Sequence, residues 1–121
     1  MTDAARRRLP DRRPSNTFDV EAFSLRFTVT ASPFNDGTTA EIFIQNHKAE
    51  SAAGIMASDS AIAASLALQY GCPADVLRKA LSRDARGNAS GPLGAALDQL
   101  TAMNSVTKDP APAPAGKETQ P

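Results

Sequence analysis

The sequence predicts a single small α+β domain, in which a three-stranded antiparallel meander packs on one long helix plus two shorter helices. Residues 17–45 alternate apolar and polar side chains with a period of two, which is typical of half-buried strands. Residues 51–103 instead repeat apolar side chains at helical spacing, and glycines and prolines mark the helix ends. The length of 121 residues fits one domain.

The first half of the domain is expected to form three strands joined by short turns. A strand begins at residue 17, and a second one spans 25–31, where large apolar residues alternate with arginine and threonine. Pro33 ends the second strand or lies on a sheet edge. The segment 35–37 reads Asn-Asp-Gly, which favours a hairpin turn, and the return strand covers 39–45.

The second half is expected to be helical. Ser51 is a suitable N-cap for a long helix that ends before Gly71, which can adopt the positive φ of a helix C-terminus. Residues 61–68 are apolar nearly all round, so this helix is expected to be buried on several sides. Shorter helices starting at Pro73 and Pro92 are expected to close the other side of the sheet.

Composition defines the two ends of the domain. Residues 1–16 are rich in arginine, residues 105–121 are rich in proline and alanine, and both segments hold too little apolar surface to fold. We expect disordered tails there and a folded domain at 17–104.

Charge and cysteine content exclude several classes of protein. Thirteen basic and thirteen acidic residues give a net charge of zero, so no global attraction to nucleic acid or membranes is expected. Cys72 is the sole cysteine, so one chain can form neither a disulfide nor a cysteine-based metal site. We see no signal peptide and no apolar run that could span a bilayer, so we expect a cytoplasmic protein without a membrane contact.

Two loops carry candidates for binding an anion, while no catalytic residue, metal ligand or cofactor is predicted. The candidates are His47, Lys48, Ser51, Arg83, Arg86 and Ser90. The first three surround a helix start, where backbone N–H groups attract anions, and the last three lie in a glycine-containing loop before Pro92. We favour the structural alternatives, namely an exposed polar loop for the first group and a helix–helix connection with Asp84 pairing an arginine for the second.

Several segments taken in order resemble one known family. They are 27–30, 36–37, 41–44, 65–71, 76–81 and the loop from 83 into 98. Their spacing is similar to that of the TSCPD domain, which occurs at the C-terminal end of vitamin B12-dependent class II ribonucleotide reductases and in short stand-alone bacterial proteins. The resemblance covers residues 17–100. The Thr-Ser-Cys-Pro-Asp type of segment is absent, and Cys72 lies elsewhere, so no redox or metal role carries over.

The resemblance implies a non-catalytic accessory or regulatory module that binds a partner protein or a nucleotide-like anion. The expected partners are a second copy of the chain, because of the apolar helix, and a ribonucleotide reductase or another protein of nucleotide metabolism and DNA replication. One alternative is nucleic-acid binding through the arginine-rich tail, although aromatic residues are not interleaved there. Another is an independent enzyme, which we rank last because no nucleophile–base pair or metal set can be assembled from these residues. The reductase activity itself is not expected, because it needs a large barrel and several cysteines.

Overall fold

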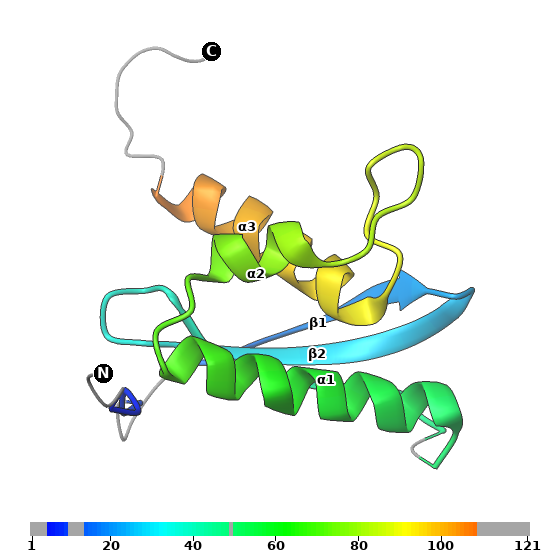
Figure 1. Cartoon of the computed structure of the whole chain (residues 1–121), viewed down its shortest axis with the longest axis horizontal. Helices are drawn as coiled ribbons and strands as arrows, with labels where there is room; N and C mark the ends of the chain where they lie inside the picture. The colour runs from blue at the N-terminus through cyan, green and yellow to red at the C-terminus, as the bar shows by residue number, and fades with distance from the viewer. Residues whose placement is uncertain (1–4, 10–13, 49, 109–121) are drawn as a thin grey trace.

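The fold has three strands followed by three helices (Figure 1). The elements are β1 (Asn16–Ala22), β2 (Leu25–Pro33), β3 (Thr39–Gln45), α1 (Ala52–Gln69), α2 (Ala74–Ala80) and α3 (Pro92–Lys108). They come from a computed structural model that describes residues 5–9, 14–48 and 50–108, with the backbone alone for 105–108. The predicted α+β class, with its antiparallel meander in the order β1-β2-β3, is confirmed.

Strand register places most of the large apolar side chains on one face of the sheet, with Phe43 on the other. Val20 on β1 pairs with Phe27 on β2, and Val29 on β2 pairs with Ile44 on β3. All four side chains are buried. The register shifts at Pro33, where the missing N–H cannot continue the ladder.

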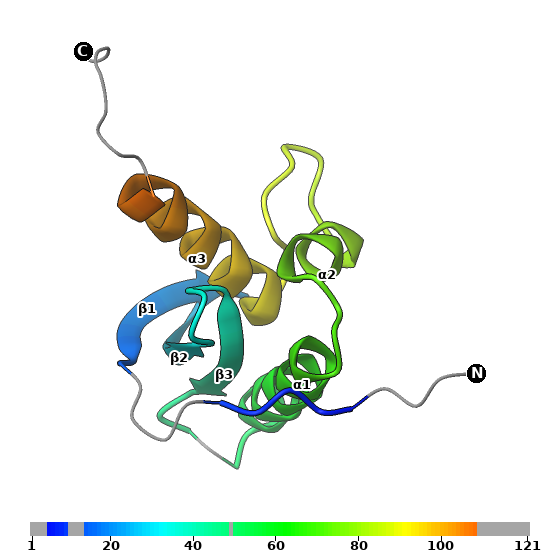
Figure 2. The ribbon, with the colours of Figure 1, turned by 90° about the vertical axis from the view of Figure 1, so that its left-hand side faces the viewer.

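Helices α1 and α3 cover this same face. Ala61, Ala64 and Leu68 from α1 join Ala96 and Leu97 from α3 in a single core with the inner strand residues. Figure 2 shows α1 beside β3, and α3 across from it above the strands. The expectation that the shorter helices close the other side of the sheet is therefore wrong. The reason is that the outer face carries mainly threonine and charged residues, which offer little apolar area to bury.

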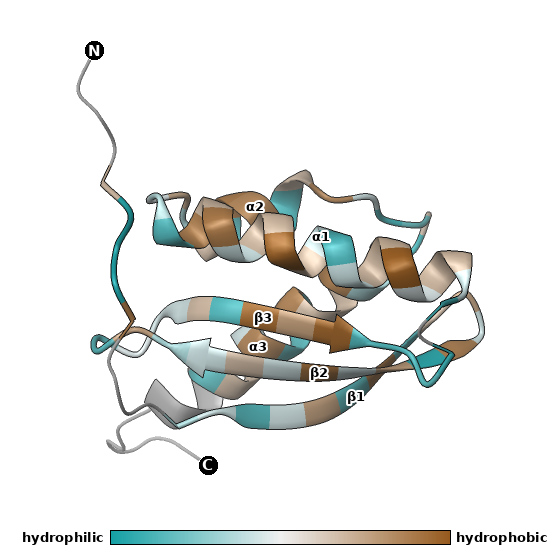
Figure 3. Ribbon diagram, turned by 90° about the horizontal axis from the view of Figure 1, so that it is seen from below, coloured by the Kyte–Doolittle hydropathy of each residue, from teal (hydrophilic) through white to brown (hydrophobic). Residues whose placement is uncertain are grey.

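Helix α1 is buried along one side only. Ile55, Ile62 and Leu66 lie on its outer side and are about half exposed, so the expected burial on several sides is wrong within one chain. Brown bands on α1 in Figure 3 mark its large apolar residues. Small residues, namely Gly54, Ala57, Ala61, Ala64 and Ser65, form most of the inner side and allow close approach to the sheet, so apolar character alone could not identify the buried side. Self-association of the chain stays a prediction.

Helix α1 also closes the free edge of β3. The Ser65 hydroxyl accepts a hydrogen bond from the Ile42 N–H (2.8 Å) and can donate to the Ile42 carbonyl (3.0 Å). The Gln69 amide donates to the Ala40 carbonyl (3.1 Å). A covered edge cannot pair with a strand from another chain.

The ends of the domain differ from the expected boundaries. Helix α3 continues to Lys108, past residue 104, and residues 5–9 lie against the end of α1 (Figure 2). Most of the predicted tails, namely 1–4, 10–13 and 109–121, lie outside the described residues. Disorder there stays a prediction. Across the part that is described, no helix combines the length and apolar character that crossing a membrane requires.

Candidate functional site

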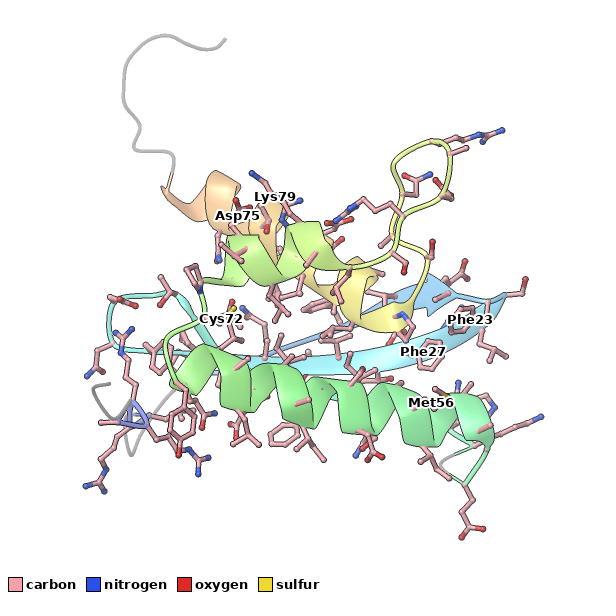
Figure 4. All side chains as sticks on the ribbon, in the orientation of Figure 1. Phe23, Phe27, Met56, Cys72, Asp75 and Lys79 are labelled. Atoms are coloured by element: carbon pink, nitrogen blue, oxygen red, sulfur yellow. The ribbon has the colours of Figure 1, made fainter. Side chains whose placement is uncertain are left out.

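An apolar groove of about 300 Å³ opens between the β1–β2 turn, the first half of α1 and the start of α3. Its lining is Phe23, Ala53, Met56, Ala57, Ser60, Leu81, Ser82, Gly91, Pro92, Leu93 and Gly94. Phe23 is 63% exposed and Met56 is 71% exposed, and Figure 4 shows both at the same end of the molecule. Large apolar side chains that stay open to solvent around a groove are typical of an interaction site.

Phe23 is held in an unusual backbone conformation. With Ser24 it forms the two-residue turn between β1 and β2, and both have positive φ, at 57° and 60°. Such turns favour asparagine and glycine, and a non-glycine residue in this region costs about 1–2 kcal/mol. The ring passes near Gly91, where an added Cβ would lie 3.9 Å from the Phe23 Cζ. A bulky exposed aromatic residue at a strained position indicates a role in binding.

Replacing Ser24 by glycine is expected to raise the free energy of unfolding by about 1 kcal/mol, because glycine adopts positive φ without strain. Urea denaturation followed by circular dichroism measures the change. Ser15→Gly is the control, since the described residues with positive φ do not include Ser15 and no gain is expected there. Equal stability of the Ser24→Gly variant and the natural chain would contradict the strained turn.

The first group of anion candidates lies in the turn before α1. Ser51 is the N-cap, as predicted: its hydroxyl accepts from the Gly54 N–H (3.1 Å) and donates to the Lys48 carbonyl (2.7 Å). His47 and Lys48 are exposed beside it. The Ser51 hydroxyl therefore serves the helix, and the two exposed side chains are what this loop could offer to an anion.

Arg83, in the second group, belongs to an ion-pair cluster. Its guanidinium donates two hydrogen bonds to Asp98 on α3, at 2.7 and 2.8 Å, and a third to the Gly87 carbonyl. Arg78 on α2 also contacts Asp98 (3.3 Å). The hydrogen bonds from Arg83, followed by those from Arg78, hold the pKa of Asp98 below its ordinary value despite partial burial. This cluster ties α2, the loop and α3 together.

The loop itself is a small hairpin. Arg83 and Ala89 form a bridge, and the Asp84 carboxylate accepts the backbone N–H groups of Arg86 and Asn88, both at 2.9 Å. The carboxylate that pairs with the loop arginine is thus Asp98, and the proposed pairing by Asp84 is wrong. Asp84 instead satisfies the backbone of its own turn, as aspartates often do. Arg86 and Ser90 are exposed.

The structure does not bring the six anion candidates together. The turn before α1 and the loop before α3 are separate segments in Figure 1. Within the described ranges, no three histidine, cysteine, aspartate or glutamate side chains gather closely enough to hold a metal ion. The half-buried Cys72 contacts the Pro73 carbonyl (3.6 Å). The anion-binding role of the six residues stays a prediction.

The groove was not predicted from the sequence. Its residues come from four separate stretches, near 23, 53–60, 81–82 and 91–94, which only the fold brings together. One local signal was available: a Phe-Ser pair in a tight link between two strands places an aromatic ring where a turn residue is expected. Met56 gave no signal of its own, because it lies next to Ile55 in a helix whose apolar residues are not confined to one side.

Comparison with known proteins relates part of the chain to one enzyme. This chain is 37% identical over 70 residues to a vitamin B12-dependent ribonucleotide reductase of Bradyrhizobium diazoefficiens. The matched residues make up 58% of this chain and 6% of that protein. This chain is also 40% identical over 68 residues to a vitamin B12-dependent ribonucleotide reductase of Agrobacterium fabrum. Here the matched residues make up 56% of this chain and 5% of that protein.

The chain contains a region related to vitamin B12-dependent ribonucleotide reductase. It spans only 5–6% of the length of these relatives. No family model and no solved structure matches the chain. The expected reductase resemblance is therefore confirmed for this region, and membership of the TSCPD family stays a prediction.

Proposed function

We propose that this chain is a non-catalytic accessory module that binds a ribonucleotide reductase through the groove at Phe23 and Met56. The observation that carries the proposal is an open apolar groove on a domain related to a reductase segment. In the relatives, the matching segment is part of the reductase chain itself. An exposed apolar groove on such a segment would offer a contact to the rest of a reductase, and a role in nucleotide metabolism would follow from that partner.

The groove has the chemistry of a protein contact. Its volume of about 300 Å³ lies at the lower end of the range for ligand sites. It is lined almost wholly by apolar side chains, with Ser60 and Ser82 as the polar exceptions. The Ser60 hydroxyl already donates to the Ala57 carbonyl (2.9 Å). Exposed Phe and Met side chains give a partner large apolar contacts, and a few such residues commonly carry most of the binding energy.

The anion-binding alternative has less support. The positive charge of Arg83 is already paired with Asp98, and the Ser51 hydroxyl caps α1. Nucleic-acid binding through the N-terminal arginines also has less support, because Arg6 and Arg7 contact the domain. The contact with a reductase is therefore the function we favour.

Met56→Glu is expected to weaken binding to the vitamin B12-dependent ribonucleotide reductase of the same organism by about tenfold or more, because a carboxylate would be buried in an apolar contact. Biolayer interferometry with the full chain measures the dissociation constant. The matched control is Val76→Glu on α2, which replaces another exposed apolar residue, 58% accessible and outside the groove lining.

The control variant is expected to bind like the natural chain. Absence of binding between the natural chain and the reductase would overturn the partner. Equal weakening by Met56→Glu and Val76→Glu would overturn the groove as the contact surface while leaving the partner in place.

A further inference from the structure

Two arginines near the N-terminus occupy a defined site at the end of the domain. The Arg7 guanidinium donates to an Asp36 carboxylate oxygen (Nη2 to Oδ2, 3.0 Å) and lies over the Phe34 ring, 3.8 Å from its centroid. Arg6 Nε donates to the Gln69 side-chain carbonyl (2.6 Å), and the Arg7 backbone N–H donates to the Gln69 backbone carbonyl (2.6 Å). Residues 5–9, which hold both arginines against the domain, form the N-terminal strap.

The hairpin half of this site is held in place without the strap. Thr38 donates to Asp36 Oδ1 from its backbone N–H (2.9 Å) and its hydroxyl (2.6 Å), so Oδ2 remains for the guanidinium. The turn is closed by hydrogen bonds from Phe34 N–H to the Thr38 carbonyl and from Gly37 N–H to the Phe34 carbonyl. Gly37 has a φ of 89°, which suits glycine. The carboxylate and the ring are therefore positioned by the turn itself.

The helix half of the site is equally fixed. The Gln69 side chain is 1% exposed, and its amide nitrogen donates to the Ala40 carbonyl on β3 (3.1 Å). That bond leaves the side-chain oxygen directed to Arg6. The Gln69 backbone carbonyl belongs to the last turn of α1, where free carbonyls and the helix dipole favour a donor or a cation.

We propose that this end of the domain is a recognition site for an arginine pair, filled here by the chain's own Arg6 and Arg7. The Phe34 ring and the oriented Asp36 carboxylate at Arg7, and the Gln69 side-chain carbonyl at Arg6, suit the flat, five-donor guanidinium and do not suit the rounded ammonium of lysine. The Gln69 backbone carbonyl adds a hydrogen bond from the Arg7 backbone N–H, which any residue could supply. Because the site does not depend on the strap for its shape, it accepts the same segment from a peptide in trans. This inference concerns a surface separate from the groove and does not depend on the reductase partner.

The first test uses a variant in which the chain's own arginines no longer fill the site. In the full-length chain with Arg6→Ala and Arg7→Ala, a fluorescent peptide of residues 1–15 is expected to bind, with fluorescence anisotropy as the readout. The natural chain is expected to bind this peptide at least about tenfold more weakly than the variant does, because its own strap competes for the site at a high effective concentration. A peptide with lysine at positions 6 and 7 keeps the charge and is expected to bind about tenfold more weakly.

The test is decisive if the double alanine variant keeps the circular dichroism spectrum of the natural chain, which shows that it is folded. Failure of this folded variant to bind the arginine peptide overturns the proposal. Equal binding of the arginine and lysine peptides also overturns it, because nonspecific charge attraction would then account for the contact.

A second variant keeps the test valid if the double alanine variant does not fold. Asp36→Asn preserves an oxygen for Thr38 and removes the charge that holds Arg7. It is expected to speed trypsin cleavage within residues 6–8 by about tenfold, as the strap leaves the site more often. Asp84→Asn, in the other loop, is expected to leave that rate unchanged. An unchanged rate in Asp36→Asn overturns the proposal.

Discussion

Replacing Ser65 by alanine is expected to lower the free energy of unfolding by about 2 kcal/mol, because a buried N–H and carbonyl lose their partner. Ile42, which supplies both groups, is fully buried, so water cannot replace the hydroxyl in the folded state. The hydroxyl can also donate to the Ala61 carbonyl (2.8 Å), but that carbonyl keeps its helical role. Urea denaturation of both chains measures the difference.

Ser58→Ala is the matched control on the same helix. Ser58 is partly exposed, so water can replace its hydroxyl, and its replacement is expected to change the stability by less than about 0.5 kcal/mol. Equal effects of the two alanine substitutions would show that α1 does not close the β3 edge through Ser65.

Replacing Asp98 by asparagine is expected to lower the free energy of unfolding by about 1–2 kcal/mol, after allowance for solvent screening. The substitution removes the charge that Arg83 and Arg78 share, and leaves two guanidinium groups side by side. The Arg78 Nε is already buried without a partner, which limits how far that side chain can compensate. Asp59→Asn, on the exposed side of α1, is the control and is expected to have little effect.

The effect of Asp98→Asn should depend on pH. The Arg83 and Arg78 hydrogen bonds keep the pKa of Asp98 below its ordinary value in the folded chain. A carboxylate with a lowered folded pKa stabilises above its unfolded pKa of about 4, and this stabilisation is lost as the pH falls through the folded pKa. The stability difference between the natural chain and the variant is therefore expected to be full near neutral pH and to shrink in acid. A difference that grows below about pH 4 would contradict the pairing.

The elements with local signals could be predicted from the sequence. Alternation gave the three strands, and the Asn-Asp-Gly turn at 35–37 gave the hairpin between β2 and β3. Ser51, Gly71 and Pro92 marked helix ends because capping, positive φ and a missing N–H are properties of single residues.

Features that depend on tertiary contacts could not be predicted. The partner of Arg83 lies fifteen residues away on α3, and a nearer carboxylate at Asp84 was the obvious local choice. The inner side of α1 consists mainly of small residues, so hydropathy pointed to no single side. The groove and the strap site join segments that are distant in the chain, as Arg6 and Gln69 show with a separation of 63 positions.

Hydrogen exchange of the full chain, with and without the vitamin B12-dependent ribonucleotide reductase of its organism, tests the proposed function most directly. The proposal predicts slower exchange on binding in the β1–β2 turn around Phe23, in residues 53–60 of α1 and at the start of α3. The hairpin at 34–38 serves as an internal reference and is expected to exchange at the same rate. No protection with saturating reductase, or protection confined to surfaces away from the groove, would contradict the account.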